Sequence, residues 1–254
     1  MTTNHERPSR IRLLICIGII AAELQRSILS SMNSQVRQDT HCLACWFPRR
    51  WCICDAALPI INPIKVDVLM HFRESNRPSS TGKLIGRLVS NADVHVWRKE
   101  RRLSVSEVQK PDRELVILHP CGQLHETLPS PEKTQVVLLD GSWRETTVMA
   151  HATTCWGVNM SLPMAGRSRF WLRAQQDESR FSTAEALARF YELNDDLESA
   201  KSLRLQLDLH VFAGLLSRGR VKLAHSFLDS SDLLTHFQPI VKRLMKKTKR
   251  DVST

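Results

Sequence analysis

Short apolar runs alternate with amphipathic segments along the middle of this chain. The runs are of strand length, and several are continuously apolar, which is typical of strands buried on both faces of a parallel sheet. The strands that this pattern predicts are residues 66–70, 94–97, 115–118, 136–139 and 170–172.

Helical signals occupy the segments between these runs. Ser182, followed three residues later by Glu185, has the form of a capping box that opens a helix running to residue 193. Further helices are expected at 82–89, 143–152 and 197–218, and turn-forming residues predict loops at 75–82 and 128–132. Strands that alternate with helices indicate an α/β fold with a mostly parallel sheet and flanking helices.

The two ends of the chain differ from this middle part. The apolar run 13–22 follows several arginines and imitates a secretory signal, but a membrane span needs roughly twenty apolar residues. We instead expect residues 1–31 to be an extension ahead of a working start at Met32. The cationic run 242–250 is either the solvated end of a helix or an arm that contacts phosphates.

The composition places the chain among ordinary globular proteins with a basic balance. Its 254 residues include 36 Lys and Arg against 26 Asp and Glu, which gives a formal net charge of +10. This excess is compatible with an ordinary basic protein, and it also suggests a polyanionic partner, with RNA or DNA as the first candidate. The length fits one large domain or one domain with small appendages.

Four of the seven cysteines lie close together in a C-x2-C-x6-C-x-C pattern. Zinc takes four ligands in a tetrahedron, and structural sites are commonly closed by four thiolates, so we expect a structural zinc site. Its ligands would be Cys42, Cys45, Cys52 and Cys54. A reduced metal site also favours a cytoplasmic protein without a membrane segment. The other cysteines, Cys16, Cys121 and Cys155, are expected to be small buried side chains.

Aromatic residues and arginines alternate between the two cysteine pairs. Such a mixture can stack on bases and clamp phosphates, or it can pack the small module against the main domain. We favour packing for Trp46 and Trp51, and contact with nucleic acid for Arg49 and Arg50.

An acid, a glycine, a hydroxyl and an indole directly follow the expected strand 136–139, as Asp140, Gly141, Ser142 and Trp143. Ligands of open α/β sheets lie beyond the carboxyl ends of the strands. A glycine there admits close approach of a ligand to the backbone, and a carboxylate accepts a proton or binds a hydroxyl. The same residues can also form a simple helix-capping turn.

Together with the cysteine cluster, this segment resembles the DTW-domain proteins, the tRNA-uridine aminocarboxypropyltransferases. Further motifs occur in the order typical of that family, namely residues 71–74 with Arg77, 81–84, 118–120, 140–143, 172–173 and 182–186. Ser142 stands where the family usually has threonine, which keeps the hydroxyl. His119 stands where the family often has tyrosine, which leaves the role of that side chain open.

The resemblance implies a SPOUT-like α/β domain with a trefoil-knotted cofactor region, S-adenosylmethionine as group donor and tRNA as partner. It implies transfer of the 3-amino-3-carboxypropyl group to N3 of a uridine, expected in the variable loop, with release of methylthioadenosine. The domains would be an extension at 1–38, a zinc module at 39–60, a catalytic domain at 61–235 and a basic tail at 236–254.

The same resemblance, weighed against the chemistry, gives a set of candidate site residues. Catalysis is assigned to Asp140, Ser142 and Trp143, with Asp140 as the base or as the group that orients N3. The expected cofactor-binding residues are Leu118, Pro120, Gly141, Arg173, Thr183 and Glu185. The expected substrate-binding residues are His71, Glu74, Arg77, Thr81 and Lys83. Trp143 either stacks on a base or fills the core, and Thr183 and Glu185 either cap a helix or also line the pocket.

Two other functions remain open at this point. A methyltransferase of the same fold would use the same cofactor in another orientation. A non-enzymatic RNA-binding module would use the cysteine cluster and the basic tail for affinity alone.

Overall fold

The computed structural model describes residues 40–101, 103–124, 130–173 and 180–251. The chain divides into two units, Met1–Leu43 and Ala44–Thr254, and the fold is that of the second unit. The predictions for residues 1–39, with the start at Met32 and the burial of Cys16, lie outside the described residues, as do residues 128 and 129 of the expected loop.

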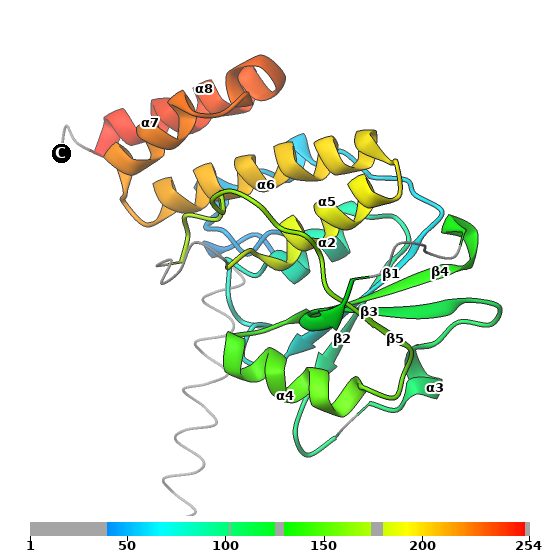
Figure 1. Ribbon diagram of the computed structural model, residues 1–254. Coiled ribbons are helices and arrows are strands. Elements are labelled where there is room, and N and C mark those ends of the chain that lie inside the picture. The colour runs from blue at the N-terminus through cyan, green and yellow to red at the C-terminus, as the bar shows by residue number, and fades with distance from the viewer. Residues whose placement is uncertain (1–39, 102, 125–129, 174–179, 252–254) are drawn as a thin grey trace, which may run out of the picture. The chain divides into compact units, whose positions relative to one another are not determined.

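Within the described part of the chain, five strands form one sheet in which every pair is parallel (Figure 1). The order across the sheet is β2-β1-β4-β3-β5. The strands are β1 (Lys65–His71), β2 (Ala92–Trp97), β3 (Glu114–Gln123), β4 (Thr134–Asp140) and β5 (Val158–Met160). The prediction of an α/β fold with a parallel sheet is confirmed, and the trefoil knot stays a prediction.

The apolar runs of β1, β3 and β4 lie in the three inner strands of the sheet and are buried, as predicted. Val68 in β1 pairs with Val94 in β2 on one side and with Leu138 in β4 on the other. All residues of β4 are buried, whereas the edge strand β2 leaves Val94 and Val96 exposed. A strand with helices on both faces needs apolar side chains at consecutive positions, which is why β4 can be recognised in the sequence. The run in β1 is broken only by the buried Asp67.

The strand expected at 170–172 is wrong, and β5 takes its place at the edge of the sheet beside β3. Phe170 and Leu172 are apolar because they pack inside the molecule from a turn. Leu172 lies against Gly214, whose missing side chain leaves room for it, and the carbonyl of Leu172 accepts a hydrogen bond from Arg218. The three-residue strand β5 contains the polar Asn159 and gave no apolar run to detect.

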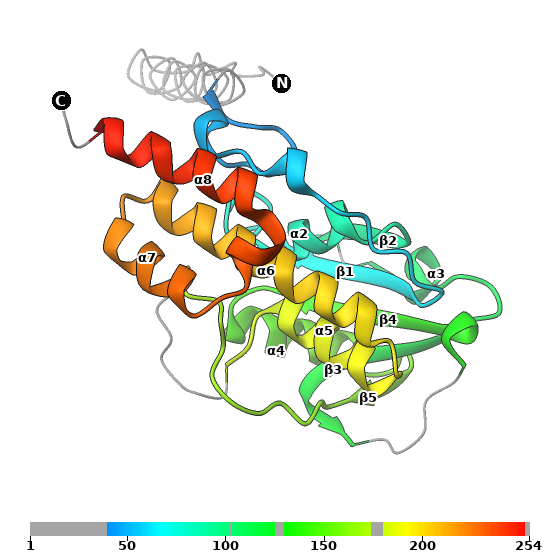
Figure 2. The same cartoon turned by 90° about the horizontal axis from the view of Figure 1, so that it is seen from above.

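Helices cover both faces of the sheet (Figures 1 and 2). On one face α4 packs on β3 and β4, and Val108 of α3 joins the same apolar cluster. On the other face α2 packs on β1 and β2, and α5 packs on β4. These helices are α2 (Thr81–Leu88), α3 (Val105–Val108), α4 (Trp143–Thr153) and α5 (Thr183–Leu193).

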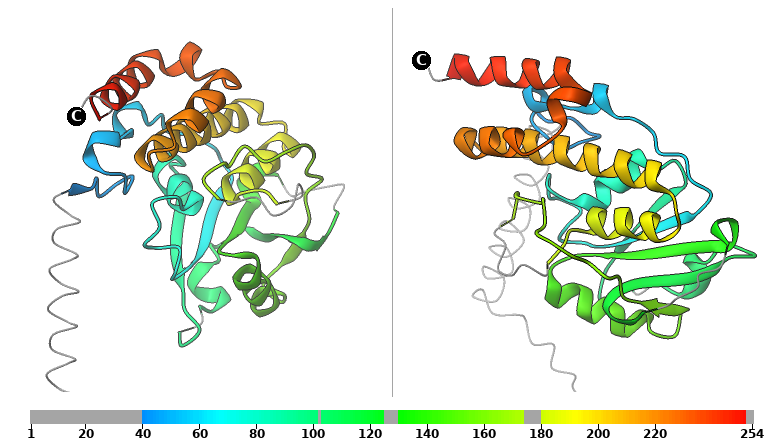
Figure 3. Two further views of the ribbon diagram at one scale, coloured as in Figure 1. Left: turned by 90° about the vertical axis from the view of Figure 1, so that its left-hand side faces the viewer. Right: turned by 45° about the horizontal axis from the view of Figure 1, so that its top comes forward.

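Three more helices form an outer layer beyond α5 (Figure 3). They are α6 (Leu197–Ser217), α7 (Val221–Asp229) and α8 (Leu233–Asp251), and short 3-10 turns lie at η1 (Arg49–Trp51), η2 (Cys54–Ala56) and η3 (Pro131–Lys133). Four expected helices are confirmed as α2, α4, α5 and α6, and α3, α7 and the start of α8 were not predicted. The cationic run 242–250 lies within α8, which bends at Phe237 just before Pro239.

None of the helices that the structure describes combines the length and the apolar character needed to cross a bilayer.

Candidate active site and cysteine cluster

Asp140 is the last residue of β4 and lies at the carboxyl edge of the sheet, opposite Met70 of β1. Its side chain is buried, with 2% of the residue exposed. The hydroxyl of Ser80 donates to its Oδ2 at 3.0 Å, and the hydroxyl of Thr183 donates to its Oδ1 at 2.7 Å. The two hydroxyls fix the plane of the carboxylate, and each oxygen keeps further acceptor capacity for a ligand.

Both hydroxyls come from the beginnings of helices. Ser80 is the N-cap of α2, and its Oγ also accepts a hydrogen bond from the backbone N–H of Lys83. Thr183 is the first residue of α5. The positive ends of two helix macrodipoles therefore lie beside Asp140, and they favour negative charge at this point.

A cavity of about 410 Å³ opens beside Asp140. Its wall combines this carboxylate with several guanidinium groups and aromatic rings, in a space bounded by Arg77, Thr81, Asp140, Gly141, Ser142, Trp143, Arg144, Ser168, Phe170, Arg173, Arg180, Phe181, Ser182 and Thr183. Trp143 is 41% exposed, and the guanidinium of Arg180 lies 5.3 Å from its ring centre. The indole therefore faces the cavity and does not fill the core.

Glu74 holds two of the arginines of this wall. Its fully buried carboxylate accepts from Arg77 Nη1 at 2.7 Å and also pairs with Arg173. Burial raises the pKa of Glu74, the Arg173 charge opposes this, and the nearby Asp140 carboxylate raises it further. The pairing orients both guanidinium groups at the cavity, where their remaining N–H groups can hold an anion.

A second, smaller cavity of about 110 Å³ adjoins the first one. Gly141, Trp143, Phe181, Ser182 and Thr183 line both cavities. The rest of its wall is mainly apolar and consists of Leu118, His119, Leu138, Leu139, Thr146 and Ala186. We call this space the apolar slot. One elongated ligand can therefore place an apolar end in the slot and a charged end beside the arginines.

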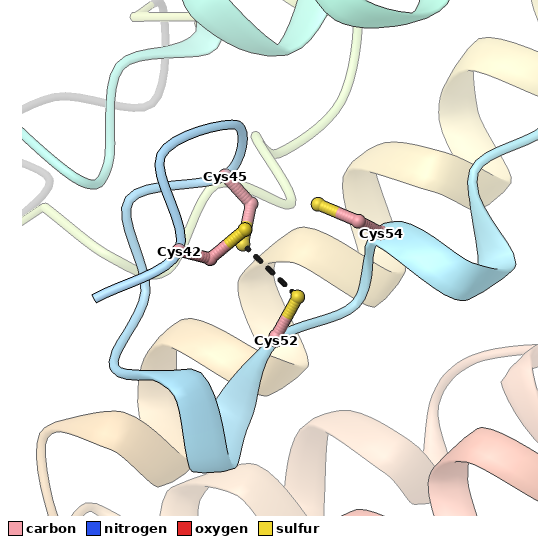
Figure 4. Close-up of side chains that lie close together, drawn as sticks. All are labelled: Cys42, Cys45, Cys52 and Cys54. Atoms are coloured by element: carbon pink, nitrogen blue, oxygen red, sulfur yellow. Dashed lines mark hydrogen bonds between the residues drawn. The ribbon is translucent and has the colours of Figure 1, made fainter. Parts of the chain in front are cut away.

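The four cysteines at 42, 45, 52 and 54 gather as the spacing predicted (Figure 4). Their sulfur atoms all lie within 4.8 Å of one another, and Cys45 Sγ is 3.8 Å from Cys52 Sγ. The edge of a tetrahedron with Zn–S bonds of about 2.3 Å is about 3.8 Å, whereas a disulfide requires about 2 Å. The donor set and its spacing fit a zinc ion held by four thiolates.

A half-buried cation lies beside this cluster. Arg87 of α2 directs its Nη1 to Cys54 Sγ at 3.7 Å, and its Nε and Nη2 have no other hydrogen-bond partner among the described residues. Buried guanidinium nitrogens need a nearby negative charge, and the thiolates of a four-cysteine metal site would supply it. The profile of the DTW domain family matches residues 39–214, a span that holds both the cysteine cluster and the cavity at Asp140. The chain belongs to the DTW domain family. No solved structure matches the chain.

The serine of the DTW motif has a local role. Ser142 is the N-cap of α4, and both its backbone N–H and its hydroxyl donate to Glu145 Oε2 at 2.8 Å. The other oxygen of Glu145 lies 3.1 Å from His71 Nδ1. The helix-capping turn considered from the sequence therefore exists, and it keeps Ser142 at the rim of the cavity.

Most of the site residues predicted from the sequence line the cavity at Asp140 or the apolar slot. His71 instead lines a neighbouring cavity of about 760 Å³ that shares Ser142 and Arg144 with the first. Pro120 is exposed at the end of β3.

Two predicted residues of the DTW domain point away from the cavity. The ammonium of Lys83 lies 3.6 Å from the ring centre of Trp46, and burial lowers the pKa of Lys83 to about 8 against the opposing charges of Asp140 and Glu74. Glu185 is buried behind the cavity wall, where it accepts from Ser182 N, Ser168 Oγ and the backbone N–H of residue 169.

Sequence reasoning missed Ser80, Arg180 and Phe181, each of which contacts Asp140 or lines the cavity. Ser80 could have been found as an N-cap signal, because a serine just before an apolar-periodic segment is the preferred start of a helix. The other two come from the loop before α5, where the sequence has no periodic signal.

The remaining predictions for the aromatic residues, arginines and cysteines have different outcomes. Phe47 and Trp51 are buried, so packing is confirmed for Trp51. Arg49 and Arg50 are exposed, and their contact with nucleic acid stays a prediction. The predicted burial of Cys121 and Cys155 is wrong, because both are exposed. Cys121 lies where β3 is irregular, between Leu118 and Gln123, and Cys155 follows α4.

Proposed function

We propose that this protein transfers the 3-amino-3-carboxypropyl group of S-adenosylmethionine to N3 of a uridine in tRNA, releasing methylthioadenosine. The DTW family is associated with this activity. The observation that carries the proposal is the position of Asp140, a buried carboxylate oriented by two hydroxyls on the wall of an otherwise arginine-rich cavity.

Asp140 accepts the N3–H of the target uracil, either to orient it or to take its proton. Uridine N3 is a poor nucleophile until that proton leaves, so an acceptor fixed by Ser80 and Thr183 lowers the barrier. The N3–carbon bond then forms as the bond between the γ-carbon and the sulfonium sulfur breaks. The sulfur keeps the electron pair and leaves as a neutral thioether, and the proton passes through Asp140 to solvent.

The arginines determine which carbon of S-adenosylmethionine reacts, because they position the γ-carbon of the aminocarboxypropyl arm. Arg77 and Arg173, held by Glu74, bind the carboxylate of the aminocarboxypropyl arm and direct its γ-carbon toward Asp140. Arg144 and Arg180 lie on the same wall and attract the RNA phosphates.

The cysteine cluster acts through structure. A bound zinc ion would fix the loop that carries Trp46 and, through Lys83 and Arg87, the helix α2 whose N-cap holds Asp140. With four thiolate ligands it keeps no open position for chemistry.

The test uses the purified chain, S-adenosylmethionine and unmodified tRNA, followed by nucleoside mass spectrometry. We expect the mass of an aminocarboxypropyl group on uridine, loss of at least ~100-fold in rate for Asp140→Asn, and an unchanged rate for the exposed-site control Asp229→Asn. The mass of a methyl group would identify a methyltransferase instead. RNA binding without any thermal stabilisation by S-adenosylmethionine would identify a binding module.

A further inference from the structure

His119 carries a hydrogen-bond donor for which the described residues offer no acceptor. It follows Leu118 near the end of β3 and is 7% exposed. Its Nδ1 accepts the backbone N–H of Cys121 at 3.2 Å, and its Nε2 has no partner. Since Nδ1 uses its lone pair for that bond, the proton of the neutral ring is on Nε2, which is therefore a donor.

The neutral form is the one present at neutral pH. Burial lowers the pKa of His119, and the charge of His151 lowers it further. A buried donor without an acceptor is unfavourable, so such a group in a cavity wall indicates that a ligand completes it. His119 lines the apolar slot and also a neighbouring cavity of about 490 Å³ that contains His151.

The slot has the walls expected for a flat heteroaromatic ring. Leu118, Leu138 and Leu139 form its apolar side, and Trp143 and Phe181 supply aromatic rings. Five residues connect it to the cavity that holds Asp140 and the arginines. An adenosine that carries an amino-acid arm matches these two spaces, because it has a flat apolar base at one end and charged groups at the other.

We infer that the slot holds the adenine of S-adenosylmethionine and that His119 Nε2–H donates to one of the adenine ring nitrogens. This inference rests on the proposed function and adds to it the residue that recognises the base. Threonine, serine and backbone groups also border the slot, but His119 supplies the donor that lacks a partner.

The experiment pairs variants of the protein with analogues of the product. The binding of 5′-methylthioadenosine and of its 1-deaza, 3-deaza and 7-deaza analogues is measured by calorimetry. In each analogue one ring nitrogen acceptor is replaced by C–H. The proteins are the wild type, His119→Leu, His119→Gln and the control His151→Leu, which alters the neighbouring cavity but not the slot.

We expect one analogue to bind the wild type and His151→Leu about 10-fold more weakly than the parent, which corresponds to about 1.4 kcal/mol. The parent and that analogue should bind His119→Leu equally, because the donor is gone. His119→Gln keeps an amide donor and should regain part of the discrimination.

Three outcomes overturn the inference. In the first, all three analogues bind the wild type as tightly as the parent does. In the second, His119→Leu still binds one analogue more weakly than the parent. In the third, His119→Leu loses affinity for uridine monophosphate and keeps its affinity for methylthioadenosine. If tRNA is modified in any of these cases, the proposed function stands and the role of His119 falls. If neither S-adenosylmethionine nor methylthioadenosine binds at all, both fall.

Discussion

Gly82→Ala tests whether the contact between α2 and Asp140 governs catalysis. Gly82 lies in the first turn of α2, directly against Asp140. A Cβ at this position would lie 2.6 Å from Asp140 Oδ2 and 2.9 Å from Val68 Cγ1. Ordinary contacts begin at about 3.5 Å, so both neighbours must move away from this Cβ by more than about half an ångström.

Neither neighbour can move cheaply. Val68 is fully buried in the central strand β1, and Asp140 is held by its two hydroxyl donors. Overpacking of this kind costs about 1–3 kcal/mol, and a weakened hydrogen bond to Asp140 adds about 1 kcal/mol. The better helix propensity of alanine offsets up to about 1 kcal/mol. The free energy of unfolding should therefore fall by about 1–3 kcal/mol.

The rate of transfer by Gly82→Ala should fall as well. A displacement of about 1 Å in a positioned catalytic group can cost about 100-fold in rate. The assays are urea unfolding and single-turnover transfer to tRNA, both below the unfolding transition. Gly86→Ala is the matched control on the same helix. Its Cβ would lie 2.5 Å from Cγ2 of Val94 and would meet only that side chain, which is 40% exposed and can rotate away. Equal transfer rates for the two variants would refute the reasoning.

Two further predictions concern the cysteine cluster and a buried histidine. Cys52→Ser should lose its zinc, as read by metal analysis. Its free energy of unfolding, measured with urea, should fall by about 4 kcal/mol, which is the stabilisation by a ligand present at about 1,000 times its Kd. A folded, zinc-free and active variant would contradict a structural zinc. His210 lies against Phe47, and burial, with the charges of Arg87 and Arg218, lowers its pKa to about 3. Between pH 6.5 and pH 3 the unfolded chain binds a proton here that the folded chain does not, so stability falls with falling pH by up to about 1.4 kcal/mol per unit. His210→Phe should lose this part of the acid slope, whereas substitution of the exposed His225 by Gln should keep it; identical slopes for His210→Phe and the wild type would remove His210 as the cause.

The local features of this protein follow from its sequence. The core strand β4 carries a continuous apolar run, residues 136–139, because both of its faces are covered, and this pattern needs no knowledge of the fold. In β1 the run is interrupted by Asp67, which is buried and is hydrogen-bonded by Gln135. The capping box at Ser182 and Glu185 uses atoms three residues apart, and the cysteine cluster spans a short loop. Interactions between residues that are close in the sequence depend on the spacing of those residues, so the spacing is enough to predict them.

The composition of the site was decided by tertiary structure. Ser80 and Thr183 reach Asp140 across 60 and 43 residues of chain. They meet because β1 pairs with β4, α2 packs on β1 and α5 packs on β4. The same packing turns Lys83 toward Trp46 and gives Leu172 its place beside Gly214, where the sequence had suggested a ligand contact and a strand. The type of a residue does not specify which distant residue its side chain will contact. The neighbours are set by how helices and strands that are distant in sequence dock on one another, and that information is not local.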